Sequence, residues 1–88
     1  MNEKELEKVL KALANKRRIA ILKYLRRIGR ASVGDVSEAI KLSFKATSKH
    51  LRILSGIDII DKEQESLTMF YFIPKINHPI VSKLLSIL

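Results

Sequence analysis

Residues 33–55 read VGDVSEAIKLSFKATSKHLRILS, and this stretch decides the fold. It contains two short helical patterns separated by a joint of two residues, Lys41 and Leu42. On a helical wheel the second pattern has one face suited to burial and cations on the opposite side. The first face carries Thr47, His50, Leu51 and Leu54, and the cations are Lys45, Lys49 and Arg52. A helix with these two faces suits the groove of a duplex, so the stretch predicts a helix-turn-helix.

The size and charge of the chain narrow its class. Its 88 residues predict a single small domain spanning residues 1–88, and an apolar content of 47% argues against disorder. Lysine and arginine number 17 against 9 acidic residues, and the net charge of +8 favours a nucleic acid or an anionic membrane surface as partner. No apolar run approaches the roughly 18 residues of a membrane span. There is also no cysteine, so a cytoplasmic protein is expected.

Capping residues define the helices in the first half of the chain. Apolar residues spaced three and four apart predict a helix over residues 3–13. Asn15 can cap a second helix, residues 16–28, which Gly29 would end. Ser32 opens a capping-box pattern for the third helix. The residues expected to face inward are Ile19, Leu22, Leu25 and Ile28 in the second helix, and Val36 and Ile40 in the third.

The pattern changes after Gly56. Residues 57–62 and 67–73 are rich in Ile, Thr, Phe and Tyr, which favour strands, and the polar EQES between them predicts a hairpin turn. A last helix is predicted from Pro79 to Leu88, because proline is well placed at a helix start. The expected fold class is therefore mainly α with a small β-hairpin (α+β), in the order α-α-α-α-β-β-α.

Both ends of the chain carry more apolar surface than one 88-residue domain can cover. We therefore expect residues 1–14 and 79–88 to form the interface of a homodimer, in which a two-fold axis brings the patch against its copy. The residues expected in this interface are Leu6, Val9, Leu10, Leu13, Ile80, Val81, Leu84, Leu85 and Leu88.

With these elements in order, the chain resembles the ArsR/SmtB class of winged helix-turn-helix regulators from about Ala12 to Ile73. The segment ALANKRRIAIL resembles the second helix of that family, SVGDVSEAI the first helix of its motif, and LSFKATSKHLRIL its recognition helix. MFYFI resembles the second strand of its wing, which would span residues 57–73. The resemblance implies a homodimeric repressor bound to pseudo-palindromic operator DNA.

Several positions depart from the pattern of that family. Its best-known metal sensors carry cysteines where residues 31–35 read ASVGD, and the last helix offers only His78. We therefore expect no metal site and no cofactor. Thr47 replaces an apolar core residue and is expected to bond a backbone carbonyl one turn back. The wing is acidic and should add little to DNA affinity, because it carries Asp61, Glu63 and Glu65.

In a helix-turn-helix, the first turns of the second helix enter the major groove deepest. The residues expected to read bases are Phe44, Lys45 and Ser48, with Lys49 close behind. Phe44 either touches a thymine methyl or folds back onto the preceding helix. The residues expected to hold phosphates are Arg52, Arg17 and Arg18. We interpret His50 as a packed, hydrogen-bonded residue and His78 as a turn or cap residue.

Two other functions fit part of the sequence. A winged helix that binds proteins and has lost DNA binding would suit the acidic wing, although the cations in residues 45–52 oppose it. An RNA-binding winged helix would prefer structured RNA over duplex DNA. An enzyme is not expected, because the chain has neither a cysteine nor a glycine-rich phosphate loop. Its two histidines also lie on separate elements without an obvious nucleophile.

Overall fold

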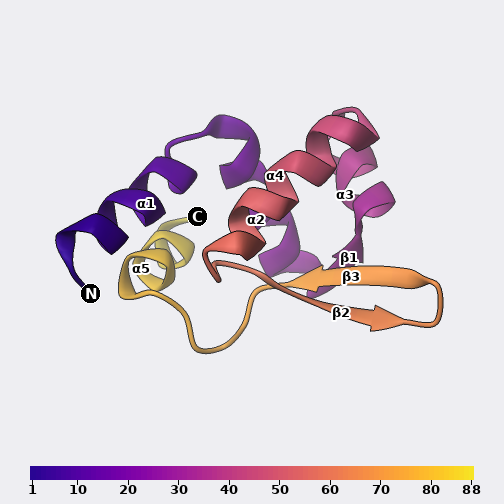
Figure 1. Cartoon of the computed structure of the whole chain (residues 1–88). Coiled ribbons are helices and arrows are strands. Elements are labelled where there is room, and N and C mark those ends of the chain that lie inside the picture. Colours follow the sequence, from indigo (N-terminus) through magenta and orange to yellow (C-terminus); the bar gives the residue numbers. More distant parts are fainter.

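The computed structural model describes residues 1–88 and contains five helices and one three-stranded sheet (Figure 1). In chain order the elements are α1 (Glu3–Leu13), α2 (Lys16–Ile28), β1 (Arg30–Ser32), α3 (Val33–Ile40), α4 (Phe44–Gly56), β2 (Asp61–Glu65), β3 (Thr68–Phe72) and α5 (Pro79–Ile87). Figure 1 shows α1 and α5 together at one end of the molecule and the β2–β3 hairpin at the other. No helix is long and apolar enough to cross a bilayer. The predicted winged helix-turn-helix is confirmed, with β1 as an additional strand.

The helix boundaries follow from side chains that bind the free amides of the first turns. The side chains of Asn15 and Ser43 each accept a hydrogen bond from the amide three residues ahead, at 3.0 and 3.1 Å. The capping box predicted at Ser32 is also formed. Gly29 ends α2 with a φ of 95°, a conformation that favours glycine. All five predicted helices are therefore confirmed to within one residue at each end.

The sheet differs from the predicted hairpin because a third strand joins it. β1 pairs antiparallel with β3, which also pairs with β2, so the strand order is β1-β3-β2. Arg30 lies opposite Phe72, and Ser32 lies opposite Phe70. A strand of three residues directly after the end of a helix is too short to show an alternating pattern, so the sequence did not indicate it.

The predicted position of the first wing strand, residues 57–62, is wrong. β2 begins at Asp61 and runs to Glu65, so it includes most of the polar segment that the sequence indicates as a turn. Ile59 and Ile60 are instead buried in the hydrophobic core. Their apolar pattern therefore reflects packing against the helices and not pairing in a sheet. The turn consists of residues 66 and 67.

The core contains fully buried side chains from all five helices and from β1. In α2 these are Ile21, Leu22 and Leu25, which confirms the predicted burial of Leu22 and Leu25 but not that of Ile19 and Ile28. Ile19 is only half-buried, and Ile28 is 49% exposed. Ile28 lies on the same side of the helix as Ile21, but in the last turn. A helical pattern gives the direction of a side chain and does not show where the neighbouring elements end.

Thr47 occupies a core position in α4, as the helical pattern predicts. Its side chain is fully buried, but Oγ1 has no hydrogen-bond partner. The expected bond to a backbone carbonyl one turn back is therefore absent. A hydroxyl in this position lowers stability, because it has lost its bonds with water and gained none within the protein.

Candidate nucleic-acid interface

α4 lies at the surface next to the joint that connects it with α3. The two helices pack against each other on either side of this joint (Figure 1). The chain turns sharply there because Lys41 adopts a left-handed conformation with a φ of 55°. Leu51 and Leu54 hold α4 against the core, so the opposite side of the helix faces solvent.

Four of the predicted contact residues lie on or beside this exposed side. Lys45, Lys49 and Arg52 are exposed, and together with Ser43 they surround a shallow hollow of about 390 Å³. Ser48 is half-buried. The structure therefore brings three cations and the hydroxyl that caps α4 to one place.

Phe44, the first residue of α4, also faces solvent. Its side chain is 62% exposed, so it does not fold back onto the preceding helix. An exposed phenylalanine next to cations is available for an apolar group on the same partner, such as a thymine methyl in the major groove.

The charge of this surface is entirely positive. α4 contains no acidic residue, and none lines the hollow beside it. The N-terminal end of a helix carries a partial positive charge, which adds to the field of the cations there. The exposed side of α4 therefore attracts a polyanion such as a nucleic acid.

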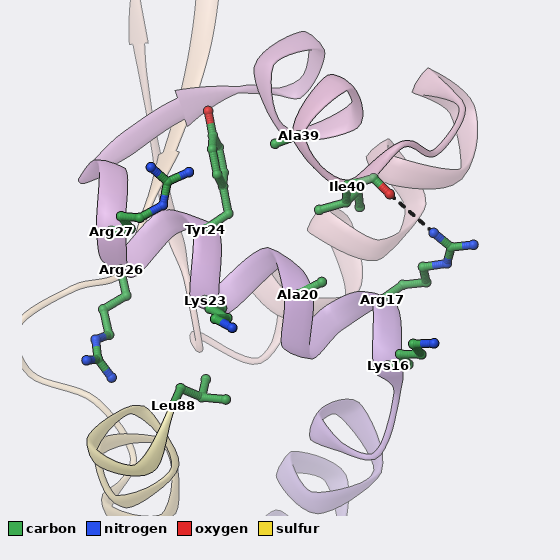
Figure 2. Close-up of a pocket in the computed structure, with 10 residues that line it drawn as sticks. All are labelled: Lys16, Arg17, Ala20, Lys23, Tyr24, Arg26, Arg27, Ala39, Ile40 and Leu88. Carbon is green, nitrogen blue, oxygen red and sulfur yellow. Dashed lines mark hydrogen bonds between the residues drawn. The ribbon is translucent and has the colours of Figure 1, made fainter.

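The two arginines at the start of α2 have different environments. Arg17 is exposed, and its Nη1 donates a hydrogen bond to the Ile40 carbonyl at 3.2 Å, beside the α3–α4 joint (Figure 2). Arg18 is half-buried: its Nε donates to the Ala12 carbonyl at 2.5 Å, and its Nη1 lies 3.2 Å from His50 Nδ1. Arg17 therefore lies exposed beside the joint with one bond to the chain, whereas Arg18 is half-buried and its guanidinium contacts both α1 and α4.

His50 is packed and hydrogen-bonded, as predicted. Burial lowers the pKa of His50 below its usual value, and the nearby cations Arg18, Lys49 and Arg17 lower it further. The ring is therefore neutral near pH 7. Nδ1 accepts the bond from Arg18, because a guanidinium offers only donors. Through Arg18, this histidine connects α4 with the last turn of α1.

The acidic wing is partly neutralised by a residue of β1. Arg30 donates to Glu63 Oε1 at 2.6 Å and also pairs with Glu65, and its guanidinium lies 4.1 Å from the centre of the Phe70 ring. Glu65 and Glu63 raise the pKa of Arg30. Sequence reasoning missed this cluster because it depends on the pairing of β1 with β3. The only signal was one more arginine just after the end of α2.

Residues of α1 and α5 line an open apolar hollow of about 310 Å³. These two helices lie at the end of the molecule away from the wing (Figure 1). Leu10 is 45% exposed there, and Ile87, which is not among the predicted interface residues, is 73% exposed. Three predicted interface residues, Val9, Leu13 and Val81, are instead buried inside the subunit, because each helix uses part of its apolar stripe for its own core. The predicted residues that remain at least partly exposed are Leu6, Leu10, Ile80, Leu84, Leu85 and Leu88.

His78 is the N-cap residue of α5, which confirms its interpretation as a cap or turn residue. Its Nε2 lies 2.8 Å from the Ile57 carbonyl. No three His, Cys, Asp or Glu side chains come together as the ligands of a metal ion would.

Residues 15–62 match the family described as "Bacterial regulatory protein, arsR family". The transcriptional activator HlyU of Vibrio cholerae serotype O1 is 38% identical over 78 residues, which cover 81% of this chain and 71% of HlyU. A solved structure of HlyU from Vibrio cholerae superposes with a TM-score of 0.81 at 30% identity, covering 99% of this chain and 92% of the other.

Two further solved structures extend this similarity. One is the homodimeric winged helix-turn-helix DNA-binding domain of Mb0332 from Mycobacterium bovis, a possible ArsR-family regulator. It superposes with a TM-score of 0.80 at 26% identity, over 96% of this chain and 74% of the other. The second is the AntR antimony-specific transcriptional repressor, with a TM-score of 0.80 at 27% identity, over 96% of this chain and 73% of the other.

Proposed function

The chain belongs to the arsR family of bacterial regulatory proteins, and from that premise we propose that it binds operator DNA sequence-specifically as a homodimer and represses transcription. The observation that carries the proposal is the exposed side of α4, where Lys45, Lys49 and Arg52 gather without an acidic neighbour. A cationic helix surface fits the major groove, because phosphates line both edges of that groove.

Position along the helix suggests separate roles for the contact residues. Phe44, Lys45 and Ser48 lie in the first turns of α4 and are proposed to contact base edges, with Lys49 close behind. Arg52 lies about two turns beyond Lys45, so it is proposed to hold a phosphate. Arg17, which lies beside the α3–α4 joint, is likewise proposed to hold a phosphate.

Arg18 is left out of this set, although the sequence suggested it as a phosphate contact. Its guanidinium bonds the Ala12 carbonyl and contacts His50, so it is proposed to position α4 and not to touch DNA. The wing is also proposed to add little affinity. Arg30 is engaged by Glu63 and Glu65 and is therefore not free to pair with a phosphate.

Base contact and phosphate contact can be separated by mobility shift on duplexes selected from a random pool. Lys45→Ala should weaken binding and relax the preference at particular base pairs, by about 1–3 kcal/mol of discrimination. Arg17→Ala should weaken binding to all sequences alike and reduce the slope of log affinity against log salt concentration by about one unit. Lys75→Ala, in the exposed loop after β3, is the matched control and should change neither.

The same assay separates the two alternative functions. If structured RNA displaces the protein from duplex DNA at equal concentration, the RNA-binding alternative is the better account. If Lys45→Ala changes nothing and no nucleic acid binds at low salt, α4 is misassigned and a protein-binding winged helix is favoured.

The homodimer is supported by the exposed apolar hollow between α1 and α5 and by the homodimeric domain of Mb0332. A two-fold pair would cover this hollow and present two α4 helices to two half-sites. Light scattering should give a dimer mass for the unchanged chain and a monomer mass for Leu10→Asp, with Lys75→Asp as a control that stays dimeric. A monomer mass for the unchanged chain would contradict this part of the proposal.

The direction of regulation differs among the relatives, since HlyU is described as an activator and AntR as a repressor. Repression is proposed from the resemblance to the ArsR/SmtB repressors and from AntR, which is described as a repressor. A reporter with the selected operator across its start site should lose expression when the protein is made and recover with Lys45→Ala. Increased expression would contradict repression while leaving DNA binding intact.

A further inference from the structure

A third hollow lies between α2, the end of α3 and residue 88, and none of its residues belongs to the α4 surface (Figure 2). Its volume is about 820 Å³. Ligand pockets in proteins commonly measure roughly 300–1,000 Å³, so this hollow is large enough for a small organic molecule. No acidic residue lines it, and its cations are Lys16, Arg17, Lys23, Arg26 and Arg27.

These five cations are not neutralised within the protein. Both ion pairs of the structure are made by Arg30, which lies outside the hollow. Lys23 lies three residues from Arg26 and four from Arg27, so their like charges repel on the surface of α2. The first turn of α2 contains no acidic residue, although the positive end of the helix favours one there. A bound anion would reduce the repulsion between these cations and supply the negative charge that the first turn of α2 lacks.

The remaining surface of the hollow is mostly apolar. It is formed by Ala20, Tyr24, Ala39, Ile40 and Leu88. In Figure 2 the Tyr24 ring stands beside Arg27, whose guanidinium is 5.6 Å from the ring centre. Ala20 and Ala39 leave the space open because their side chains are small. An inorganic anion would leave this apolar surface exposed, whereas an anion with an apolar body would cover it.

We propose that this hollow binds an amphipathic organic anion, in which a carboxylate, sulfonate or phosphate is attached to an aromatic or aliphatic body. The ligand is also connected to α4, because Arg17 lines the hollow and bonds the Ile40 carbonyl at the α3–α4 joint. An anion that attracts the Arg17 guanidinium removes this bond, and the placement of α4 then changes. This regulatory step rests on the proposed DNA-binding function, whereas occupation of the hollow does not.

Binding is tested on the full chain without DNA, with a pair of fluorescent probes. 1-Anilinonaphthalene-8-sulfonate carries the anionic group, and N-phenyl-1-naphthylamine has the same body without it. Lys23→Gln combined with Arg26→Gln should lower the affinity for the sulfonate roughly tenfold and the affinity for the uncharged probe less than about twofold, because only the sulfonate loses two charge contacts. Lys75→Gln, which removes a cation elsewhere on the surface, should change neither.

The apolar surface has its own variant. Ala39→Leu fills the hollow from α3, where residue 39 is exposed and helical, so it should weaken both probes while far-ultraviolet circular dichroism stays unchanged. The proposal is overturned if Ala39→Leu changes the binding of neither probe, or if Lys23→Gln/Arg26→Gln weakens the binding of both probes equally. If only Leu10→Asp abolishes the binding of both probes, the probes bind between α1 and α5, and the proposal is also overturned.

Coupling to DNA is then measured by mobility shift on the selected duplex at physiological salt. The sulfonate should lower duplex affinity for the unchanged chain, and this effect should disappear in the Lys23→Gln/Arg26→Gln variant. If that variant loses duplex affinity as Lys45→Ala does while its sulfonate binding is unchanged, this face holds DNA and the ligand proposal is overturned. A chain that binds the sulfonate but no duplex would refute the DNA-binding function and leave the ligand site standing.

Discussion

Replacing Thr47 with valine should stabilise the protein, which is unusual for a core substitution. Oγ1 of Thr47 is fully buried without a hydrogen-bond partner, and an unpaired buried polar group costs about 1–3 kcal/mol. Valine has nearly the same shape, so it removes that cost and leaves no cavity. The two residues also have similar helix propensities, so α4 is not weakened. We expect a gain of about 1–2 kcal/mol in the free energy of unfolding.

The gain is large enough to measure in a chain of 88 residues. A change of 1 kcal/mol shifts the melting temperature of such a domain by roughly 4–8 °C. Urea unfolding followed by circular dichroism should show a higher midpoint with an unchanged slope, at one fixed protein concentration because dimerisation adds to stability. Thr68→Val, at the exposed first residue of β3, is the control and should stay within about 0.5 kcal/mol. A destabilised Thr47→Val protein would refute the reasoning and show that Oγ1 has a partner in solution.

Three further predictions concern ionisable residues. Lowering the pH through about 6.5 should reduce the free energy of unfolding, because the pKa of His50 is lowered in the folded state and the unfolded chain takes up the proton first. Urea titrations of the His50→Gln protein should lack this pH-dependent loss. An equal loss in the unchanged and the His50→Gln protein would contradict the prediction. Arg18→Met should destabilise the fold by about 1–3 kcal/mol and raise the pKa of His50, which a proton NMR titration measures. Glu63→Lys with Glu65→Lys should tighten non-specific DNA binding at low salt, because it reverses two charges and releases Arg30. Unchanged affinity would show that the wing lies away from the phosphates.

Features that depend on neighbouring residues could be predicted from the sequence. The helices begin at Asn15, Ser32 and Ser43 because each side chain bonds an amide only three residues ahead. The cationic side of α4 follows from the helical period alone, which is why Lys45, Lys49 and Arg52 come together as expected.

Features that depend on distant residues could not be predicted in the same way. The pairing of Arg30 with Glu63 spans 33 residues and requires β1, which is too short to leave a pattern. The contact between Arg18 and His50 requires the packing of α2 against α4. A cation near a helix start looks the same in the sequence whether it faces a phosphate or a carbonyl of its own chain. Arg17 and Arg18 are adjacent and both donate to carbonyls of their own chain, but Arg17 is exposed and Arg18 is half-buried.

The bond from Arg18 to the Ala12 carbonyl also bears on the geometry of the operator. In the proposed homodimer α1 belongs to the interface and α4 to the DNA, and one side chain in each subunit joins them. The distance between the two α4 helices is then fixed by short, rigid contacts and not by a flexible linker. Dimeric helix-turn-helix proteins bind half-sites about 34–36 Å apart, one turn of the duplex, or a multiple of that distance. Tolerance of an altered spacer between the half-sites is therefore a direct measure of how firmly Arg18 holds the two helices in place.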